Sequence, residues 1–577
     1  MFIPPGEKIV DTKKCRISGQ EFFVTDRDLE FYDKISPIFE GKKYSIPSPT
    51  LCPDERKINI LCFRNDRHLY KNKSSLSGQD IIAVFREDSP FTIYTPEEWY
   101  GDTWSPANFA QNVDFNDNIF SQIHSLSWRV PHMNLIQRSN ENSEYANEWR
   151  NNTSCYLIFN WSENIQSYYS SYCDRNRNIF DCTYIKDCEL CYECVNVKNC
   201  YNVSHSINVD FCTHSQYIAD CLSCEYCFWC VNLATKKCYI LNQKVSQEQY
   251  ADFLHHFTTD TEAQRDFFQR FQTLKLSLLS RSMQGNSNEQ VFWEYIYHSK
   301  DVFLGFDILE SQHVRYSDLV ERSHDIYDCF RSRYSEYCYF NEVASTGASH
   351  VAFNLISIGC INTLYSQQVY NTHDCFACIW LHNHEHHCIL NKSYSTQEYE
   401  TLCGKIIDHM RSTGEWGEFF PHELSPFWYN ETVANEYFPM TESEVQVKGW
   451  NWYAEPTAIF SGTSYIPLPI REYDERVVWN TLAQKNIDEV LAGIIQCEVT
   501  GKPFKIIKQE LAFYIENSIP IPVKHPDQRH KERMNLRNPR TLFERTCAEC
   551  YKDIITTYAP KRLEKVVCEE CYRKLVY

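Results

Sequence analysis

The sequence predicts a mainly β protein: two tandem, narrow parallel β-solenoids of about 12 residues per coil, with capping helices, flanked by duplicated zinc-ribbon-like modules. Three observations support this fold class. Small or aliphatic residues recur at every third position over two long stretches, like residues recur at every twelfth position, and the two ends of the chain repeat one another. A helix has about 3.6 residues per turn and a strand about two, so neither produces a period of three. A narrow coil does, if each short side turns one residue inward.

Composition limits the class of protein. The chain has 577 residues, a net charge of −19 and 28 cysteines. So acidic a chain is not expected to coat nucleic acid or membranes. Its first residues, MFIPPGEKIV, lack the basic and apolar regions of a signal peptide, and no apolar run is long enough to span a membrane. We therefore expect a cytoplasmic protein without a membrane partner, whose cysteines are thiols or metal ligands; a secreted, disulfide-rich protein is the alternative.

The first element is a module over 1–130, and the last element, over 485–577, repeats it. Cys15 and Gly19 recur 482 positions later as Cys497 and Gly501. A second block recurs at an offset of 473: Pro47, Arg56, Arg64, Asn65 and Arg67 correspond to Pro520, Arg529, Arg537, Asn538 and Arg540. The same offset aligns four polar residues with four cysteines: Ser74, Ser77, Thr95 and Glu98 with Cys547, Cys550, Cys568 and Cys571.

The first solenoid is predicted over 150–243. Every third residue from Cys155 to Leu233 is small or aliphatic except Trp161, and none of them is charged. Residues twelve positions apart form three ladders: Cys188, Cys200, Cys212 and Cys224; Tyr156, Tyr168, Phe180 and Tyr192; and Asn196, Asn208, Asp220 and Asn232. Asparagine and aspartate are typical of turns, so the last ladder indicates a repeated corner of the coil.

The stretch CLSCEYCFWC, Cys221–Cys230, has the spacing of iron–sulfur or zinc ligands. The cysteines of this series, however, alternate with valine, isoleucine and serine in the same ladders, and a free cysteine behaves as a small apolar residue. We therefore interpret them as core packing. A metal cluster at Cys221–Cys230 and disulfides are the alternatives, although the ligands of one cluster would have to converge from different ladders.

A helical cap or linker is predicted over 244–290, a second solenoid over 298–390, and a helix with an aromatic, proline-rich wrapping segment over 391–480. The triplet pattern from Val302 to Cys338 resumes at Ser345 after a one-residue slip. Both solenoids end alike, in CFWCVNLATKKCYILN and CFACIWLHNHEHHCILN, and continue into amphipathic stretches that would cover an open end. The run His382–His387 is a candidate transition-metal site, with exposed turn histidines as the alternative.

The C-terminal module contains the strongest site signal. Its four cysteines have the spacing CxxC-x17-CxxC: Cys547, Cys550, Cys568 and Cys571. Two such pairs place four thiolates around one tetrahedral zinc ion, and since protein fills every position, the predicted cofactor is one structural Zn²⁺. The N-terminal copy lacks all four ligands, so we expect packing alone to hold it. A weak metal site at Cys15 and Cys52 is a further candidate.

Parts of the chain resemble known sequence patterns. CRISGQEFFVTDRDLEFY…PTLCPDERK looks like the zinc-ribbon pattern CxxCGxxF…FY…P…CPxCR, with Ser18 and Glu55 in place of two cysteines. The whole length, including GEWGEFFPHELSPFWYNETVANEYFP and TTYAPKRLEKVVCEECY, is similar to a family of uncharacterised, cysteine-rich zinc-ribbon and β-solenoid proteins of candidate-phylum bacteria. The resemblance implies an architecture and no assigned activity.

Motifs of catalysis are missing from the sequence. It has no G-x-S-x-G, P-loop, G-x-G-x-x-G after a strand, or H-E-x-x-H, and we expect no enzyme. Acidic residues of the second solenoid could serve a polysaccharide-active enzyme, but a solvated acidic surface is the expected state in a chain of charge −19. These residues are Asp301, Asp307, Glu310, Asp318, Glu321, Asp325 and Asp328.

The stretch over 524–545 is basic, although the chain as a whole has a net charge of −19. Its candidate nucleic-acid contacts are Lys524, Arg529, Lys531, Arg533, Arg537 and Arg540. Pairing with the acidic solenoid is the alternative, and we favour it.

The sequence thus predicts a non-enzymatic, cytosolic, zinc-binding scaffold for a macromolecular partner, a protein rather than RNA. An RNA- or ribosome-associated protein is the second hypothesis, and a polysaccharide-active or iron–sulfur redox protein the third; the oligomeric state is not indicated.

Overall fold

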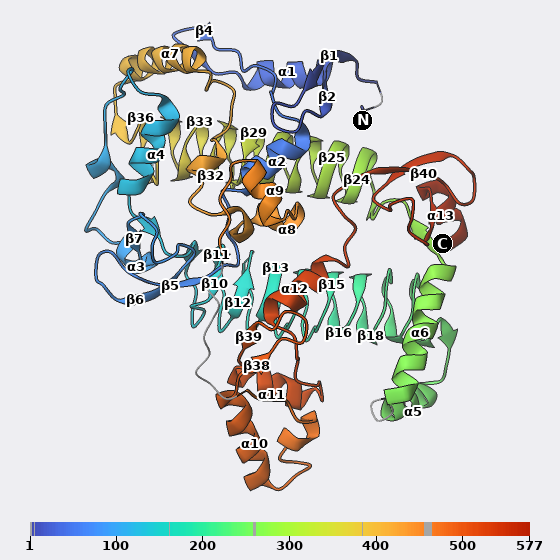
Figure 1. Cartoon of the computed structure of the whole chain (residues 1–577). Helices are drawn as coiled ribbons and strands as arrows, with labels where there is room; N and C mark the ends of the chain where they lie inside the picture. The colour runs from blue at the N-terminus through green and yellow to red at the C-terminus, as the bar shows by residue number, and fades with distance from the viewer. Residues whose placement is uncertain are drawn as a thin grey trace. The chain divides into compact units, whose positions relative to one another are not determined.

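The computed structural model describes residues 3–4, 6–160, 162–257, 261–382, 385–454 and 464–576. Over these residues the protein is mainly β, with a β-solenoid of about 19 turns and 12-residue coils, flanking helical regions and a C-terminal four-cysteine cluster (Figure 1). The chain forms two compact units. Unit 1 comprises 1–136, 279–453 and 539–577, and unit 2 comprises 137–278 and 454–538. Each unit contains one stretch of coils.

Parallel strand pairs stack the coils of unit 2. Tyr156 pairs with Tyr168, Ser171 with Thr183, and Thr183 with Val195, so each residue lies beside the residue twelve positions on. This confirms the predicted coil length. The strands are β9 (Gln137–Arg138), β10 (Ala146–Asn147), β11 (Trp149–Arg150), β12 (Tyr156–Phe159), β13 (Tyr168–Asp174), β14 (Thr183–Lys186), β15 (Val195–Lys198), β16 (Tyr201–Ser204), β17 (Ile207–Asp210), β18 (Thr213–Gln216), β19 (Glu225–Phe228), β20 (Lys237–Ile240) and β21 (Gln243–Lys244).

A backbone corner at every third residue explains the period of three. From Ser154 to Leu241 each third residue has a positive φ, for example 53° at Asn196 and 56° at Asn208, and the next residue turns inward. Asparagine and aspartate tolerate this left-handed region better than other non-glycine residues. The predicted polar ladder is confirmed, because Asn196 Nδ2 donates to Asn208 Oδ1 at 2.9 Å and Asn208 Nδ2 to Asp220 Oδ1 at 3.0 Å.

We expect Asn208→Val to lower the free energy of unfolding by about 2–4 kcal/mol. A β-branched residue in the left-handed region costs about 1–2 kcal/mol, and two side-chain hydrogen bonds of about 1 kcal/mol each are lost. Asn208→Gly loses the same hydrogen bonds but adopts the corner without strain, so its loss should be about half as large. Denaturant titration of both variants measures the difference; equal losses would mean that the corner imposes no backbone penalty.

Cysteine, valine and isoleucine fill the interior of the unit 2 coils as one core cluster. Cys191, Cys194 and Cys212 are fully buried. The thiols donate hydrogen bonds to carbonyl groups of their own coil, as Cys200 Sγ does to Lys198 O at 3.0 Å. These contacts satisfy the weak S–H donor without a metal, and the cysteines therefore pack the core as small apolar residues.

The coils of unit 1 pair in the same way, with Val302 beside Val314. Not every coil has twelve residues, because His373 pairs with His386, thirteen positions on. Another longer coil lies around Gly347, with a φ of 85°, where Glu336 pairs with Ser349. This is the slip that the sequence predicted. The strands are β23 (Gly285–Asn286), β24 (Glu289–Tyr297), β25 (Lys300–Leu309), β26 (Gln312–Arg315), β27 (Asp318–Glu321), β28 (His324–Arg333), β29 (Glu336–Asn341), β30 (Ala344–Ser345), β31 (Ser349–Ala352), β32 (Leu355–Ile358), β33 (Ile361–Leu364), β34 (Gln367–Tyr370), β35 (His373–Phe376), β36 (His386–Ile389) and β37 (Lys392–Ser393).

Helices follow both stretches of coils and contact their last turns. In unit 2 the ring of Phe253 lies 5.2 Å from that of Phe228, and in unit 1 the ring of Tyr399 lies 5.5 Å from that of His387. Every helix that the structure describes is too short or too polar to cross a membrane. The helices that follow the coils are α5 (Gln247–Phe257), α6 (Thr261–Ser277) and α7 (Thr396–Thr413).

The N- and C-terminal segments contain similar elements in the same order. Helix α2 (Pro53–Leu61) and helix α12 (Pro526–Met534) are offset by 473 positions, as the sequence blocks are. The N-terminal series is β1 (Ile9–Lys14), β2 (Glu21–Thr25), α1 (Asp26–Ile35), α2, β5 (Tyr70–Lys73), β6 (Asp80–Ala83), β7 (Ile93–Tyr94) and α3 (Pro96–Trp99). The C-terminal series is β38 (Ile495–Gln496), β39 (Pro503–Phe504), α11 (Lys508–Glu516), α12, β40 (Phe543–Thr546), β41 (Asp553–Thr556), β42 (Lys565–Val567) and α13 (Glu569–Val576).

Short elements complete both units. They are β3 (Ile38–Phe39), β4 (Lys42–Lys43), η1 (Pro106–Phe109), α4 (Ile119–Arg129), β8 (His132–Met133), β22 (Leu279–Arg281), η2 (His422–Leu424), η3 (Tyr429–Glu431), α8 (Val433–Tyr437), α9 (Glu442–Val447), η4 (Ile470–Tyr473) and α10 (Asn480–Ala492). Strand β22 pairs in parallel with β42, which connects the C-terminal strands to the segment that precedes the unit 1 coils.

Candidate metal centre and basic helices

The four C-terminal cysteines lie at the ends of neighbouring elements of unit 1. The hairpin of β40 and β41 has Cys547 and Cys550 in its turn, while Cys568 lies between β42 and α13 and Cys571 lies in the first turn of α13. A backbone hydrogen bond of 2.9 Å ties the first CxxC pair to β42. The two pairs predicted from the sequence are thereby brought together.

The geometry of this cluster suits a tetrahedral metal ion. All four sulfur atoms lie within 4.8 Å of one another, and those of Cys550 and Cys568 are 3.7 Å apart. Sulfur atoms that each lie about 2.3 Å from one tetrahedral zinc are separated by roughly 3.8 Å. Burial raises the pKa of Cys547, but hydrogen bonds from backbone amides of both pairs lower it by more, to about 6. A thiol that ionises near neutral pH is a ready metal ligand.

Cys568 and Cys571 resist ionisation without a cation, since the pKa of each thiol is raised. Hydrogen bonding to Cys568, followed by burial, raises the pKa of Cys571 to about 12. Like charges at this separation oppose one another, so four thiolates require a bound cation to coexist. Cys547 is buried, Cys568 and Cys571 are half-buried, and Cys550 is exposed, so an ion can enter from the surface. The residues present therefore fit a closed, four-sulfur metal site.

A carboxylate takes the corresponding place in the N-terminal copy. Glu98 Oε2 accepts hydrogen bonds from Ser74 Oγ at 2.5 Å and from the Thr95 backbone N–H at 2.9 Å. Burial raises the pKa of Glu98, and hydrogen bonds from Ser74 and Ser77 lower it by more, so the net direction is downward. The expectation that packing alone holds this copy is therefore wrong. Hydrogen bonds centred on Glu98 join the two turns that zinc ligands would occupy.

Cys15 and Cys52 lie side by side in the N-terminal segment, buried against Phe22 and Leu51. The hydroxyl of Ser18, which replaces a zinc-ribbon cysteine, lies 3.7 Å from Cys52 Sγ. Among the described residues, the four-cysteine cluster is the one group in which three or more metal ligands converge. The pair thus offers two thiols, and a weak metal site there stays a prediction.

The thiols of Cys221–Cys230 line a coil rather than surround a point. The Cys224 thiol contacts those of Cys221 and Cys227, but each comes from a different side of the coil. No converged ligand group occurs here within the described part of the chain. Hydrogen bonding to Cys224 and burial raise the pKa of Cys221, whose Sγ donates to Ala219 O at 3.3 Å. The lack of convergence and the thiol–carbonyl hydrogen bonds favour packing groups over the iron–sulfur alternative.

The histidines of the run His382–His387 point to different neighbours. His382 Nδ1 lies 3.0 Å from Trp380 O, as a donor to that carbonyl. The next two positions lie outside the described residues. The ring of His386 instead lies 4.9 Å from that of His373, on the preceding coil. The described histidines of the run therefore do not converge, and the ring of His386 stacks on a residue that the sequence analysis did not consider, His373.

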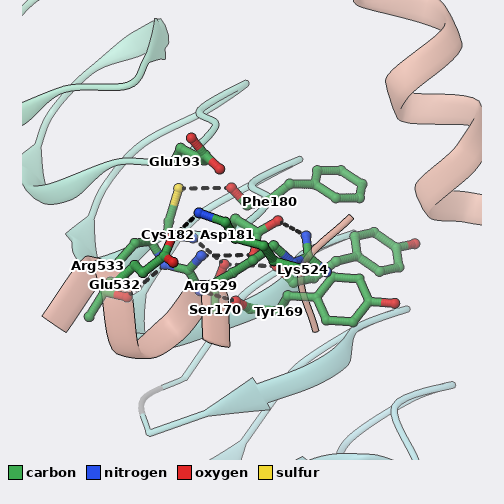
Figure 2. A network of polar contacts seen from close by, with 12 residues as sticks. Tyr169, Ser170, Phe180, Asp181, Cys182, Glu193, Lys524, Arg529, Glu532 and Arg533 are labelled. Atoms are coloured by element: carbon green, nitrogen blue, oxygen red, sulfur yellow. Dashed lines mark hydrogen bonds and ion pairs between the residues drawn. The ribbon is translucent and has the colours of Figure 1, made fainter. Parts of the chain in front are cut away.

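The basic helix α12 contacts the coils of unit 2 through a buried polar network (Figure 2). Arg529 and Arg533 both donate to Asp181, the latter at 2.8 Å, and the Asp181 side chain is fully buried. Glu510 of α11 accepts hydrogen bonds from Arg529 at 3.4 Å and from the Tyr169 hydroxyl at 2.7 Å. Two guanidinium groups and two carboxylates thus balance one another away from water, where each group depends on its partners.

The other predicted nucleic-acid contacts divide between buried and exposed positions. Arg537 lies 3.5 Å above a tyrosine ring in unit 2, and in unit 1 Arg540 donates to Asp318 at 2.5 Å. Lys524 pairs with a glutamate of α12 at 2.9 Å, and Lys531 is exposed. A buried guanidinium cannot reach a phosphate without leaving its partner. Of the six candidates, the four arginines therefore serve contacts within the protein.

The N-terminal helix α2 makes equivalent contacts in unit 1. Arg56, the counterpart of Arg529, donates to the buried Asp328 at 2.7 Å, and Lys57 pairs with Asp318 at 2.9 Å. Both aspartates belong to the acidic set considered for polysaccharide chemistry, and both are held in buried ion pairs. The sequence analysis favoured pairing of the basic stretch with the acidic solenoid but did not name these two aspartates as partners, because aspartate is also an ordinary choice for a turn. The sequence signal that could have identified these contacts was the recurrence of the same basic block in the N- and C-terminal modules, which indicates the same role for both copies.

Comparison of the chain with protein-family models and with curated proteins finds no match. By its sequence and structure, the chain is a cysteine-rich β-solenoid protein with a C-terminal four-cysteine cluster.

Proposed function

We propose that this chain is a non-catalytic β-solenoid scaffold that presents one face of its unit 2 coils to a protein partner. The observation that carries this proposal is a set of exposed apolar side chains. Tyr201, Phe211 and Leu222 have exposed fractions of 42%, 57% and 38%. They lie around one corner of neighbouring coils: Phe211 forms the corner, with a φ of 53°, Leu222 directly precedes the same corner one coil later, and Tyr201 follows it one coil earlier. Apolar groups gathered on a surface typically mark an interaction site.

Stacked rings extend this surface. The ring of Tyr201 lies 5.3 Å from that of His214, which stacks on Tyr226 at 5.1 Å with an interplanar angle of 9°. Aromatic residues are enriched at protein interfaces because they offer a large contact area and lose little side-chain entropy. A row of such rings, repeated coil by coil, suits an extended segment of a partner protein.

Two further features support a protein partner over a nucleic acid or a substrate. Four of the five arginines of the basic stretch are buried in the chain, Arg529, Arg533, Arg537 and Arg540, which leaves few cations for a phosphate backbone. Over the described residues the coil interior is filled by its own side chains, which leaves no channel for a ligand there. A cytosolic location is part of the proposal, because a core of thiols in mutual contact is kept reduced in a reducing compartment.

Affinity purification from the cells that produce the protein tests the proposal. We expect the full chain to capture a protein whether or not nuclease is added, and Tyr201→Ser with Phe211→Ser to reduce that capture at least tenfold. The matched control is Ile361→Ser, since Ile361 is 46% exposed on the coils of unit 1 and should leave capture unchanged. Capture that disappears with nuclease, or that survives the double substitution, contradicts the proposal.

The second part of the proposal is that the four-cysteine cluster holds one structural Zn²⁺. Four sulfur ligands at tetrahedral spacing leave no open position for water or substrate, which is typical of structural sites. The segment around the cluster has a small core of Cys547, Val567 and Tyr572, so metal binding should supply much of its stability.

We expect about one zinc per chain in protein purified without chelator, and Cys568→Ser to lose it. Hydrogen exchange over 547–571 should then rise by about tenfold or more, because the two turns are no longer tied together. Cys52→Ser, which removes a thiol of the N-terminal pair, should keep the zinc. Elemental analysis and mass-detected exchange measure both effects; zinc retained by Cys568→Ser would contradict the assignment.

A further inference from the structure

A cleft of about 1060 Å³ lies in unit 1, between the N-terminal segment and the segment that follows α7. Its walls come from the turn after β1, from α2, from the start of α4 and from residues 414–450. Ligand pockets typically have volumes of roughly 300–1000 Å³, so this cleft has room for more than one side chain of a partner. We call it the glutamate cleft, after five lining residues: Glu55, Glu415, Glu418, Glu423 and Glu444.

Two buried residues of the glutamate cleft have polar atoms that are not hydrogen-bonded. Glu55 is 6% exposed, and its Oε1 accepts a hydrogen bond from Lys448 at 2.8 Å, but its Oε2 has no hydrogen-bond partner among the described residues. His422 is 7% exposed, and over the same residues its Nε2 has no partner either. Buried polar groups are nearly always hydrogen-bonded, so these two atoms indicate a ligand that donates hydrogen bonds.

The charge of the glutamate cleft favours a cationic ligand. Within the described part of the chain, its five glutamates face two basic residues, Arg16 and Lys448. Both are already paired, Arg16 with Glu418 at 3.2 Å and Lys448 with Glu55 at 2.8 Å. Burial lowers the pKa of His422 to about 4, so its ring is neutral near pH 7 and does not repel a cation. The cleft therefore has an excess of negative charge that a ligand can balance.

Aromatic rings in the cleft discriminate between kinds of cation. The ring of Trp450 stacks on that of His422 at 4.4 Å with an interplanar angle of 11°, and Phe120 and Phe419 line the same cleft. A guanidinium group is planar, stacks on aromatic rings and has five donors, whereas an ammonium group is a strongly hydrated point charge. Arginine therefore fits a wall of rings and hydrogen-bond acceptors better than lysine does.

The N-terminal copy differs from the C-terminal copy at this cleft. Ser18 and Glu55, which stand where the zinc-ribbon pattern has cysteines, both line it. The corresponding residues of the C-terminal copy are Thr500 and Gln528, at the offsets of 482 and 473. The C-terminal copy thus has no carboxylate at the position of Glu55, and a cation site is expected in the N-terminal copy alone.

We propose that the glutamate cleft binds an arginine-bearing segment of a protein, with the guanidinium group at Glu55. Exposed apolar residues of the rim would contact the residues beside that arginine, since Ile17 is 43% exposed and Val447 is 89% exposed. The site belongs to unit 1 and shares no residue with the apolar face of the unit 2 coils. It therefore adds a second, chemically different contact to the proposed scaffold.

A random heptapeptide library displayed on phage tests the proposal, panned in parallel on the full wild-type chain and on Glu423→Lys. Glu423 is an exposed residue of the cleft, so this substitution reverses a charge without disturbing the core. We expect the peptides enriched only on the wild type to share an arginine beside an apolar residue. A synthetic peptide of that sequence should bind about tenfold more weakly to Glu55→Gln, and equally weakly to the wild type when its arginine is replaced by lysine.

Glu30→Lys is the matched control, because Glu30 is exposed on α1 and lies outside the cleft. It should leave peptide binding unchanged, as should Tyr201→Ser with Phe211→Ser, so failure of the unit 2 face is distinguishable from failure of this site. Panning that enriches no peptide, the same peptides on wild type and Glu423→Lys, or sequences without a shared arginine overturns the proposal. If Glu55→Gln does not fold, the comparison with Glu423→Lys decides.

Discussion

Replacing Asp181 with asparagine should lower the free energy of unfolding by about 3 kcal/mol or more. The Asp181 carboxylate is fully buried and accepts hydrogen bonds from both Arg529 and Arg533. Asparagine keeps the shape and the left-handed corner, whose φ is 52°, but removes the charge and leaves two buried guanidinium groups near one another. Removing one partner of a buried ion pair typically costs about 3–5 kcal/mol. Denaturant titration of the full chain measures the loss.

Asp187→Asn provides the matched control for this substitution. Asp187 has a similar φ of 54°, lies on the same coils, and pairs with Arg175 at 2.7 Å, but both side chains are more than a third exposed. A surface ion pair contributes about 0–1 kcal/mol, so this variant should be nearly as stable as the wild type. Equal effects of the two substitutions would mean that α12 does not depend on the buried network.

Replacing Glu98 with alanine should destabilise the N-terminal segment by about 2–3 kcal/mol. The substitution removes the acceptor of the Ser74 hydroxyl and of the Thr95 backbone N–H. Hydrogen bonds to a charged group contribute about 1.5–3 kcal/mol, and the donors left behind are partly shielded from water. Hydrogen exchange over 70–99 should rise in Glu98→Ala, whereas zinc chelation should leave this segment unchanged and affect 547–571.

Acid should weaken the same contacts. Because the pKa of Glu98 is lowered in the folded protein, its stabilising effect is present above the unfolded pKa of about 4.3 and is lost as pH falls through the lower, folded value. Glu98→Gln should therefore flatten the acid limb of the exchange profile over 70–99. An unchanged acid limb in this variant would show that Glu98 does not hold the two turns together.

The correspondence between the two copies allows a stronger check. Ser74→Cys, Ser77→Cys, Thr95→Cys and Glu98→Cys together restore the ligand pattern of the C-terminal copy, and this variant should bind one additional zinc ion. If the fourfold variant gains no zinc, the two copies do not share the geometry of their turns. The control is Glu98→Cys alone, which should gain none, since one thiolate cannot replace four ligands.

The amino-acid sequence by itself determined the coil length, the slip at one coil and the place of the four-cysteine cluster. Each of these features depends on short sequence patterns. A corner at every third residue imposes the period of three, and stacking at twelve residues brings like side chains into contact, as with Asn196, Asn208 and Asp220. The four-cysteine cluster could be predicted from its CxxC pairs, because the ligand spacing of a closed metal site is short and depends little on the rest of the fold.

Only the tertiary structure decided which distant side chains meet. Arg529 and Asp181 are 348 positions apart, and nothing local marks Asp181, among the aspartates at coil corners, as the one that holds two arginines. His373 and His386 meet because one coil separates them, and Glu98 takes the place of a metal because three donors converge on it. Such contacts depend on how coils stack and where helices pack on them, and the free energy of a buried charge or a bound ion depends on that placement rather than on residue type.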